Sequence, residues 1–554
     1  MNQPRLYAQE VGRQYYESGA WTTRLLVDYF DERVAASPHK VAIVEAHRTW
    51  TYEELQSASC NLASALLRLG VGKGDVVGAQ LPNWAELPIV HLATDRIGAI
   101  FLPLSEGFRQ AELQHLLKQA RVRVLFCAAM LHGEDHLKFI ATLRPQLTAL
   151  EQVIAVRGNP QAGCFEALSA DDSWRSTDGE ARLASARGGA DEPSHVMVSS
   201  GSTGMPRCSL YSDNNTAVKL MQQYVLAADV SASDIAAALA PAGTGSTGYN
   251  YPILAMLLHG GTSVLLEHWN GGRLYEVMEL MRRHRCTIAV AVPAQLAKLV
   301  NAARETQQPA PQLRVITNAG AKLPPSVAEA AEKAFGCRVQ SIYGTSEAGA
   351  TTMTSIHDTP TKRRNTVGRP LLGQEVRILA DDGSTAPQGQ PGEVCWRGAN
   401  KSYGFLHDKD STTKVWDADG WLHSGDLGCI DSEGYLQIVG RKKDMIIRGG
   451  QNINPGAIEE ALLEHPSVME IAVVPFDDEV LGERIAACVV TSDDGLALES
   501  LKSLVLARGM AAWHQPELLV RVLELPRNAG GKVDKRFLTA LAVQVAREKE
   551  AKAA

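Results

Sequence analysis

Residues 198–207 read VSSGSTGMPR and follow an apolar run that predicts a strand over 195–199. This Ser/Thr/Gly-rich loop can fold its backbone N–H groups and hydroxyls around phosphate oxygens, because glycine lets the chain approach a ligand closely. It is not a Walker A loop, since the GxxxxGK[ST] spacing is absent. Taken alone, the same composition also describes a flexible surface loop. The rest of the chain must therefore decide whether this is a phosphate site.

The chain on both sides of this loop alternates short apolar runs with amphipathic segments. One helix is expected over 51–69, with Thr51 as its cap and Glu54 three residues on, and another over 85–97. This rhythm predicts parallel sheets covered by helices. Residues 157–193, rich in Gly, Ser, Ala and Asp, interrupt it and are interpreted as a connection. The expected strands are 41–44, 76–80, 99–104, 122–127, 153–156, 263–266, 288–292 and 315–317.

Two later regions complete the predicted architecture. Residues 372–398 carry short strands between the Gly-rich turns DDGS and QGQPGE, which predicts a small β-rich subdomain. Beyond residue 441 we expect helices over 455–464 and 498–506 and strands over 470–474, 485–490 and 518–523. We therefore predict an α/β fold: a large domain over 1–442, with two αβ-layered sheets of parallel type and the β-rich subdomain, and a small, mobile α+β domain over 443–554.

The composition excludes several classes of function. The chain has 554 residues with a net charge of -7, so no overall basic surface exists to hold a nucleic acid. No run of about 18 apolar residues predicts a membrane span, and no signal peptide is recognised, so a cytoplasmic protein is expected. None of the nine cysteines forms a CxxC pair, which supports neither a zinc site nor a redox pair. No oligomeric state is predicted.

Four motifs follow the loop in order: IYGTSE at 342–347, HSGD at 423–426, GRKKD at 440–444 and LPRNAGGK at 525–532. Each is weak alone. Together with the loop, in this order and spacing, they resemble the adenylate-forming (AMP-binding) superfamily, and within it the acyl-CoA synthetase or acid–CoA ligase type. The resemblance covers nearly the whole chain.

The resemblance implies a two-step reaction that uses ATP, Mg²⁺ and CoA. A carboxylic acid becomes acyl-AMP, and the CoA thiol then displaces AMP. Two anions must meet in the first step, which calls for fixed positive charge. The implied catalytic residues are Lys532, which bridges the carboxylate and the α-phosphate, Glu347, which binds Mg²⁺, and Arg441. The implied ATP-binding residues are Ser199, Ser200, Gly201, Ser202, Thr203, Gly204, Arg207, Asn318, Ala319, Gly320, Tyr343, Gly344, Thr345, Ser346, Asp426 and Arg441.

Other roles are implied in the same way. Tyr343 offers a flat face to adenine, opposite residues 318–320, while Asp426 and Arg441 contact the ribose. Lys443 is the implied hinge about which the small domain rotates between the two steps. The residues implied to contact CoA are Arg448, Gly449 and Gly450.

The sequence departs from the family pattern at two places. The phosphate loop ends in Pro206-Arg207-Cys208, where the family has Pro-Lys-Gly. Arginine keeps the charge but not the shape of lysine. Residues 240–249, APAGTGSTGY, lack the family's usual histidine, and their small side chains suggest a roomy acid pocket. No aspartate can be assigned to an amino group of the substrate, which favours a non-amino acid.

Several functions stay open at this stage. We favour CoA as the acceptor of a medium-chain, alicyclic or aryl acid, with a role in fatty acid metabolism. The alternative is a stand-alone adenylation enzyme that loads a carrier protein, since it needs the same residues. A non-catalytic nucleotide-binding protein and a luciferase-type oxygenase are further readings, and the altered loop at 207–208 is the one feature that favours the former.

Overall fold

The computed structural model describes residues 9–158, 163–199, 205–269, 272–306, 308–478, 480–527 and 533–553. These form two compact units. The first comprises residues 1–376 and 396–422, and the second comprises residues 377–395 and 423–554. The domain boundary expected after residue 442 stays a prediction.

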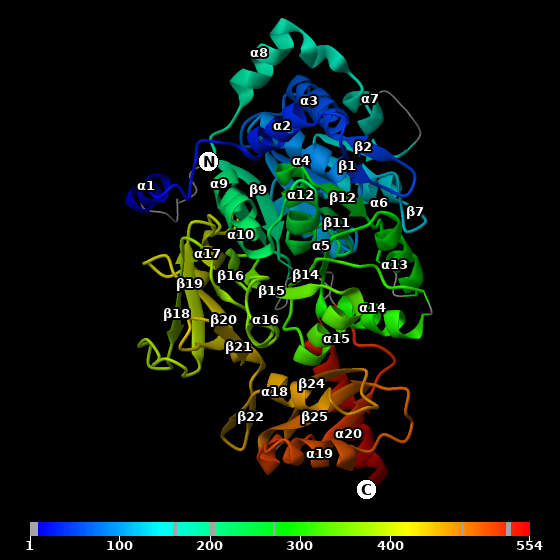
Figure 1. Ribbon diagram of the computed structural model, residues 1–554, viewed down its shortest axis with the longest axis vertical. Coiled ribbons are helices and arrows are strands. Elements are labelled where there is room, and N and C mark those ends of the chain that lie inside the picture. Colours follow the sequence, from blue (N-terminus) through cyan, green and yellow to red (C-terminus); the bar gives the residue numbers. More distant parts are fainter. Residues whose placement is uncertain are drawn as a thin grey trace. The chain divides into compact units, whose positions relative to one another are not determined.

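A six-stranded sheet forms the first layer of the larger unit (Figure 1). Its strands from β9 to β8 are parallel, and only β10 runs antiparallel to its neighbour. The expected parallel pattern is confirmed, although β10 was not expected. In spatial order the strands are β10 (Cys208–Ser212), β9 (Pro193–Val198), β4 (Ile100–Leu104), β3 (Val76–Gln80), β5 (Val124–Ala128) and β8 (Gln152–Val156).

A nine-stranded sheet forms the second layer, again with a parallel centre and antiparallel edges. The sequence predicted four of these strands, at 41–44, 263–266, 288–292 and 315–317. It did not predict the edge strands β2, β16 and β17, the eight-residue β15 or the central β11. In spatial order they are β17 (Arg369–Pro370), β16 (Gly349–Met353), β15 (Arg338–Thr345), β14 (Val315–Asn318), β13 (Ile288–Ala291), β11 (Ile235–Ala238), β12 (Thr262–Leu265), β1 (Val41–Val44) and β2 (Thr49–Thr51).

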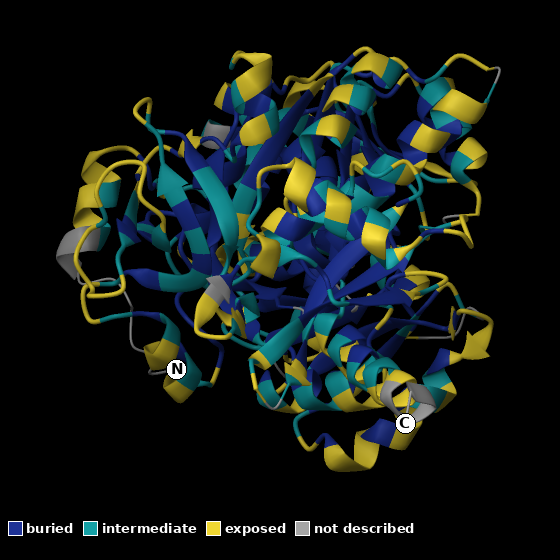
Figure 2. Cartoon of the chain, turned by 90° about the horizontal axis from the view of Figure 1, so that it is seen from below, coloured by how far each residue is buried: buried dark blue, intermediate teal, exposed yellow. Residues whose placement is uncertain are grey.

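Both faces of the nine-stranded sheet are buried, which explains the continuous apolar runs of its strands. In β13, Ile288 and Val290 join a core that also contains Phe101 of the six-stranded sheet. Ala289 and Ala291 point the other way, into a second core. Figure 2 shows many of the strands in the buried colour, whereas the helices at the surface carry exposed residues.

Helices cover both sheets. Helix α3 begins as predicted, because the Thr51 hydroxyl accepts from Glu54 N at 3.2 Å and Thr51 N donates to the Glu54 carboxylate at 2.7 Å. The helices of this unit are α1 (Gln9–Glu17), α2 (Leu26–Ala36), α3 (Tyr52–Arg68), α4 (Glu86–Arg96), α5 (Gln110–Gln119), α6 (His136–Leu143), α7 (Phe165–Ser169), α8 (Thr177–Ala186), α9 (Asp213–Ala217), α10 (Tyr224–Ala228), α11 (Thr247–Tyr249), α12 (Met256–His259), α13 (Leu274–Arg283), α14 (Pro293–Glu305), α15 (Pro325–Phe335), α16 (Pro360–Asn365) and α17 (Lys409–Val415).

The connection expected over 157–193 is more structured than its composition suggests. It contains α7 and the ten-residue α8, whose first turn is capped by the Ser176 hydroxyl, which accepts from Gly179 N at 3.1 Å. Within α8 only Gly179 is buried. A helix with so little apolar surface leaves almost no periodic pattern in the sequence, which is why it was missed.

The smaller unit contains most of a four-stranded sheet, β18 (Gln374–Leu379), β19 (Gly392–Gly398), β20 (Leu422–Ile430) and β21 (Leu436–Arg441). The β-rich region predicted at 372–398 supplies its first two strands, which straddle the boundary between the units. A five-stranded sheet follows. It comprises β22 (Ile446–Arg448), β23 (Gln451–Ile453), β24 (Glu470–Asp478), β25 (Gly482–Val490) and β26 (Leu518–Arg521).

Three helices cover the five-stranded sheet: α18 (Pro455–Leu462), α19 (Leu498–Ala507) and α20 (Lys535–Ala553). Along β24, Ile471 and Val473 face a core that includes residues of α18 and α19. The alternate residues Ala472 and Val474 face a core shared with α20. The predicted α+β character of this region is therefore confirmed. None of the described helices is long and apolar enough to cross a membrane.

Candidate active site

The carboxyl ends of β14 and β15 bring two predicted nucleotide-binding segments together. β14 ends at Asn318, which pairs with Ser341 of the parallel neighbour β15. Asn318 is buried, and within the described residues its Oδ1 atom accepts no hydrogen bond. Ala319 is also buried, and Gly320 has a φ of +87°, which favours glycine. This edge of a parallel sheet is where ligands of α/β proteins commonly bind.

The next segment begins on β15 and turns back along β16. The half-buried Tyr343 ring contacts Trp396 edge-on, with centroids 5.6 Å apart and an interplanar angle of 69°. Gly344 lies so close to the returning strand that a Cβ atom would be 2.1 Å from Gly349 O. Thr345 pairs with the same Gly349. Glycine at 344 therefore has a packing reason that does not depend on any ligand.

Two distant side chains anchor the backbone around Glu347. Tyr211 donates its hydroxyl to Ser346 O at 2.8 Å, and the Ser402 hydroxyl donates to Glu347 O. Burial, with a further contribution from the Glu347 charge, raises the pKa of Tyr211, so the phenol keeps its proton and remains a donor. The Glu347 side chain is half-buried, and within the described part of the chain no hydrogen bond or ion pair engages its carboxylate. That carboxylate fits a site for a hard cation such as Mg²⁺.

The predicted phosphate loop is closed at its base. Ser199 N donates to Arg207 O at 2.9 Å, and Arg207 N donates to the Ser199 hydroxyl at 3.1 Å. The Arg207 guanidinium lies over the Phe405 ring, 4.7 Å from its centroid. Ser200, Gly201, Ser202, Thr203 and Gly204 lie outside the described residues.

Cys208, one of the two departures from the family pattern, has a structural explanation. It pairs with Val198 as the first residue of β10 and is fully buried. Burial raises its pKa to about 12, so the thiol stays neutral. Cys208 is therefore a packing residue behind the loop. The same strand carries Tyr211, which connects the loop's base with the segment around Glu347.

The small residues of 240–249 also serve packing. A Cβ atom on Gly243 would lie 2.7 Å from Ser105 Cα, and one on Gly245 would lie 2.9 Å from Val196 O. One on Gly248 would lie 2.4 Å from Pro241 O. At these glycines the neighbouring backbone fills the space. The roomy pocket expected from this stretch is therefore wrong at these positions, because their small size permits close approach rather than open volume.

In the smaller unit, Asp426 and Arg441 face each other across the β20–β21 hairpin. They are paired in register, and Arg441 Nε lies 2.7 Å from Asp426 Oδ1. The Asp426 side chain is only 6% exposed, whereas that of Arg441 is 34% exposed. Asp426 N donates to the Ser424 hydroxyl at 2.9 Å, and that hydroxyl donates to Val394 O at 2.6 Å. The arginine thus orients the Asp426 carboxylate, and the serine fixes the Asp426 backbone.

The segment after Arg441 contains the predicted hinge and CoA-binding residues. Lys443 lies in a 3₁₀ turn, Lys442–Asp444, and burial lowers its pKa, with a further contribution from Arg441. Gly449 and Gly450, with φ of +56° and +79°, form the turn between β22 and β23. Two left-handed residues are what a tight hairpin turn needs. The glycine pair therefore has a local structural reason, and its contact with CoA stays a prediction.

Arg448, the third predicted CoA residue, forms a two-pronged ion pair. Its Nη2 and Nε atoms lie 2.9 Å and 3.2 Å from the carboxylate of Glu517. The guanidinium is thus held against the sheet by an interaction within its own unit. Any contact with CoA must share or replace this ion pair.

The structure brings several predicted residues together within each unit. The larger unit groups residues 318–320, 343–347 and the base of the 199–207 loop, and the smaller unit pairs Asp426 with Arg441. Lys532 lies outside the described residues. Sequence reasoning missed Tyr211, Ser402 and Trp396, because each is far from the motif it supports and carries no spacing pattern of its own.

Comparison with known proteins gives a consistent result. A sequence model of the family described as AMP-binding enzyme matches residues 30–406, and one described as AMP-binding enzyme C-terminal domain matches residues 457–532. The chain is 31% identical over 530 residues to a medium-chain fatty-acid–CoA ligase of Escherichia coli, covering 95% of this chain and 91% of the relative. It is also 31% identical over 538 residues to a salicyl-AMP ligase / salicyl-S-ArCP synthetase of Mycobacterium tuberculosis, covering 95% and 92%.

A solved structure supports the same fold. An anthranilate CoA ligase in complex with anthranoyl-AMP matches with a TM-score of 0.83 at 22% identity, over 95% of this chain and 98% of that one. At this identity the likeness bears on the fold alone. It confirms the predicted α/β class, with a large sheet-containing part and a small C-terminal part.

Proposed function

The chain belongs to the AMP-binding enzyme family, and from that premise we propose that it joins a carboxylic acid to CoA through an acyl-adenylate. Acid adenylation is the step supported by both ligase relatives. The finer proposal is that CoA accepts the acyl group and that the acid is of medium chain, alicyclic or aryl. The medium-chain fatty-acid–CoA ligase relative supports this choice of acceptor.

One observation carries the adenylation proposal: the half-buried Glu347 carboxylate, with no partner among the described residues, at the end of the parallel sheet. In this proposal Glu347 holds Mg²⁺, which supplies positive charge to the phosphate oxygens when it is bound. The substrate carboxylate attacks the α-phosphate, and pyrophosphate leaves. Lys532 neutralises the charge that builds up there, and residues 199–207 surround the phosphates.

In this proposal one set of residues contacts the adenine and another contacts the ribose. Tyr343 and residues 318–320 contact adenine, and the base can stack on the part of the tyrosine ring that Trp396 does not cover. Asp426 accepts hydrogen bonds from the ribose hydroxyls, because the Arg441 ion pair orients its carboxylate. In the second step the CoA thiol attacks the acyl carbon, and AMP leaves.

Acid-dependent exchange of radiolabelled pyrophosphate into ATP tests the first step. The panel comprises medium-chain fatty acids, cyclohexane carboxylic acids, benzoates and steroid acids. We expect exchange with at least one class, and no exchange when the acid is left out. Absence of exchange with every class would favour a nucleotide-binding protein without catalysis.

The same acid then identifies the acceptor. Free CoA and a phosphopantetheinylated carrier protein are offered separately, and thioester formation is measured by mass spectrometry. We expect acyl-CoA to accumulate. Thioester on the carrier alone would instead support the carrier-loading function, for which the salicyl-S-ArCP synthetase relative is the precedent.

The Tyr211 anchor provides a second prediction. In Tyr211→Phe the hydroxyl that donates to Ser346 O is lost, so the Glu347 segment is held less firmly. We expect the free energy of unfolding, measured in urea, to fall by about 1 kcal/mol. We also expect kcat/KM for adenylation to fall about 5-fold, which corresponds to a loss of about 1 kcal/mol of transition-state stabilisation.

Tyr52→Phe is the matched control. Tyr52 is likewise buried, and its hydroxyl donates to a backbone carbonyl, Gly261 O, at 2.7 Å, but it lies in the core. Tyr52→Phe should lower the free energy of unfolding by about as much as Tyr211→Phe and leave the rate of adenylation unchanged. Equal kinetic effects in the two variants would show that Tyr211 acts through general stability alone.

A further inference from the structure

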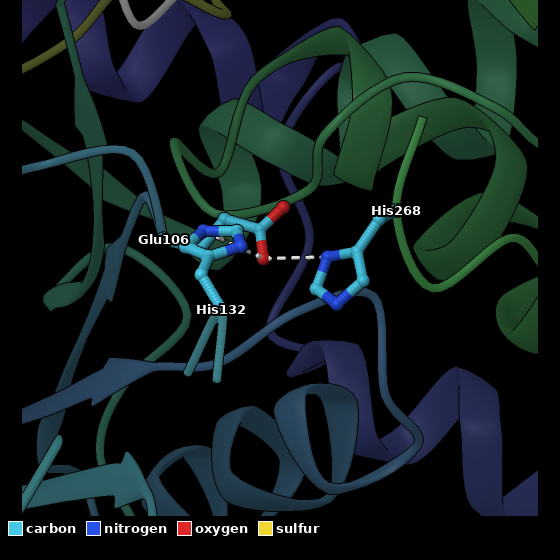
Figure 3. Close-up of side chains that lie close together, drawn as sticks. All are labelled: Glu106, His132 and His268. Carbon is cyan, nitrogen blue, oxygen red and sulfur yellow. Dashed lines mark ion pairs between the residues drawn. The ribbon is translucent and has the colours of Figure 1, made fainter. Parts of the chain in front are cut away.

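Three side chains from distant parts of the larger unit converge on one point (Figure 3). The Glu106 Oε2 atom lies 2.8 Å from His268 Nδ1 and 3.9 Å from His132 Nε2. One donor atom from each residue lies within 4.8 Å of the other two. The buried Oε2 atom receives no well-directed hydrogen bond from the described residues, so the two imidazoles are its neighbours without satisfying it.

Glu106 is held by a fixed turn after β4. Gln80 Nε2 donates to Ser105 O at 3.0 Å, and Gly107 N donates to the Ser105 hydroxyl at 3.2 Å. The Gln80 amide is itself held by His136, whose Nε2 atom lies 2.8 Å from Gln80 Oε1. The carboxylate therefore projects from a backbone that is fixed on both sides.

His132 lies at the tip of a tight hairpin between β6 (Met130–Leu131) and β7 (Glu134–Asp135). It has a φ of +52°, and the next residue, Gly133, has a φ of +82°. A left-handed conformation is uncommon for a residue with a side chain, although histidine tolerates it better than most. The hairpin thus holds the imidazole at one defined position.

His268 follows a segment that is fastened after β12. Asn83 Nδ2 donates to Leu266 O at 3.0 Å, and Trp84 Nε1 donates to the Glu267 carboxylate at 2.7 Å. The three side chains therefore come from three separately braced segments, which limits how far they can move apart. Such bracing is what a binding site needs in order to be preorganised.

We propose that Glu106, His132 and His268 bind a divalent transition-metal ion, with zinc as the best fit. Two imidazoles and one carboxylate are a donor set that zinc, cobalt and nickel accept readily, whereas Mg²⁺ prefers oxygen ligands. Metal–ligand bonds of about 2.0–2.1 Å place tetrahedral ligand atoms about 3.3 Å apart. This separation lies between the 2.8 Å and 3.9 Å distances from Glu106 Oε2 to the two histidine nitrogens. The side chains of both histidines are 40% exposed, so water can supply a fourth ligand.

This site is distinct from the proposed Mg²⁺ site at Glu347. Along the nine-stranded sheet, β12 is separated from β15 by β11, β13 and β14. Four strand spacings correspond to about 19 Å. A metal here would join a turn of the six-stranded sheet to one of the nine-stranded sheet. The spacing of the cysteines could not indicate it, because none of its ligands is a cysteine.

The test uses the untagged full-length protein, stripped with EDTA and dialysed. Zinc binding is measured by isothermal titration calorimetry, and Co²⁺ binding by its visible absorption bands. We expect one equivalent of zinc per chain, a tetrahedral or five-coordinate cobalt spectrum, and a higher thermal midpoint with metal. His132→Ala and His268→Ala should each weaken zinc binding by at least about 10- to 100-fold, the loss caused by mutating even the residues that hydrogen-bond to metal ligands.

Two further variants keep the result interpretable. Glu106→Gln preserves the shape of the side chain and should also weaken zinc binding, with the fold checked by circular dichroism. His39→Ala removes a histidine whose side chain is 86% exposed and lies outside the cluster, and it should bind zinc like the wild type. No stoichiometric binding, or equal affinity in all variants, would mean that the cluster is only an ion pair and would overturn the proposal. Neither outcome depends on the acid–CoA ligase activity.

Discussion

Replacing Lys532 with alanine is expected to slow acyl-adenylate formation about 10²- to 10³-fold, the usual loss when one group that stabilises developing charge is removed. Thioester formation from supplied acyl-AMP should change by less than about 3-fold, because in the proposed rotation of the small domain Lys532 is replaced by the surface that accepts the thiol before that step. The two half-reactions are measured separately, by pyrophosphate exchange and by acyl-CoA production from synthetic acyl-AMP.

The described flanks of residues 528–532 explain why Lys532 can be replaced without disrupting the fold. Arg527 and Val533 form an antiparallel bridge, and Asp534 N donates to Pro526 O at 2.8 Å. Backbone contacts therefore hold the two flanks together. We expect these contacts to persist when the Lys532 side chain is removed.

Lys535→Ala is the matched control for this experiment. Its ammonium group lies 2.7 Å from the Glu459 carboxylate and 3.2 Å from Val473 O, so its charge is used within the smaller unit. Its loss should lower stability slightly and affect the two half-reactions equally. If Lys532→Ala also reduced both half-reactions by the same factor, the assignment of Lys532 to the first step would be wrong.

The sequence predicted the scaffold well because buried parallel strands have a strong pattern. The strands at 41–44 and 76–80 were placed at their observed bounds, and α3 was placed within one residue of its observed start and end. Strands buried on both faces are near-continuous apolar runs, and their short length separates them from helices. Boundaries shifted mainly where strands extend past the core, as in β24, which runs on to Asp478 beside β25.

The candidate site was predicted through its motifs, while its supports were not. Asp426 and Arg441 were named separately, but nothing in their spacing shows that they pair in register. Tyr211 reaches Ser346 across 135 positions, and such contacts depend on how the sheets stack. The glycines at 243 and 245 were misinterpreted for the same reason, because the backbone that fills their space comes from another part of the chain.

Lys443→Pro is expected to slow thioester formation from acyl-AMP about 10- to 100-fold while adenylation changes by less than about 3-fold. Hinges need a few residues whose φ and ψ can change, and proline fixes φ near −65° and removes an N–H donor. Lys443 is the middle residue of the short turn Lys442–Asp444, between the end of β21 and the start of β22. If the predicted small domain, residues 443–554, rotates at Lys443 between the two steps, a rigid residue there slows the second step more than the first.

Lys443→Ala separates the backbone from the side chain in this prediction. Alanine removes the ammonium group but leaves φ and ψ free, so both half-reactions should stay within about 3-fold of the wild type. Asn454 adds a structural constraint, because its Nδ2 atom donates to Val439 O across the proposed pivot. Rotation at Lys443 must break this hydrogen bond, so Asn454 also opposes the movement that proline would block. Equal losses in both half-reactions with proline, or equal effects of proline and alanine, would place the pivot elsewhere in the chain.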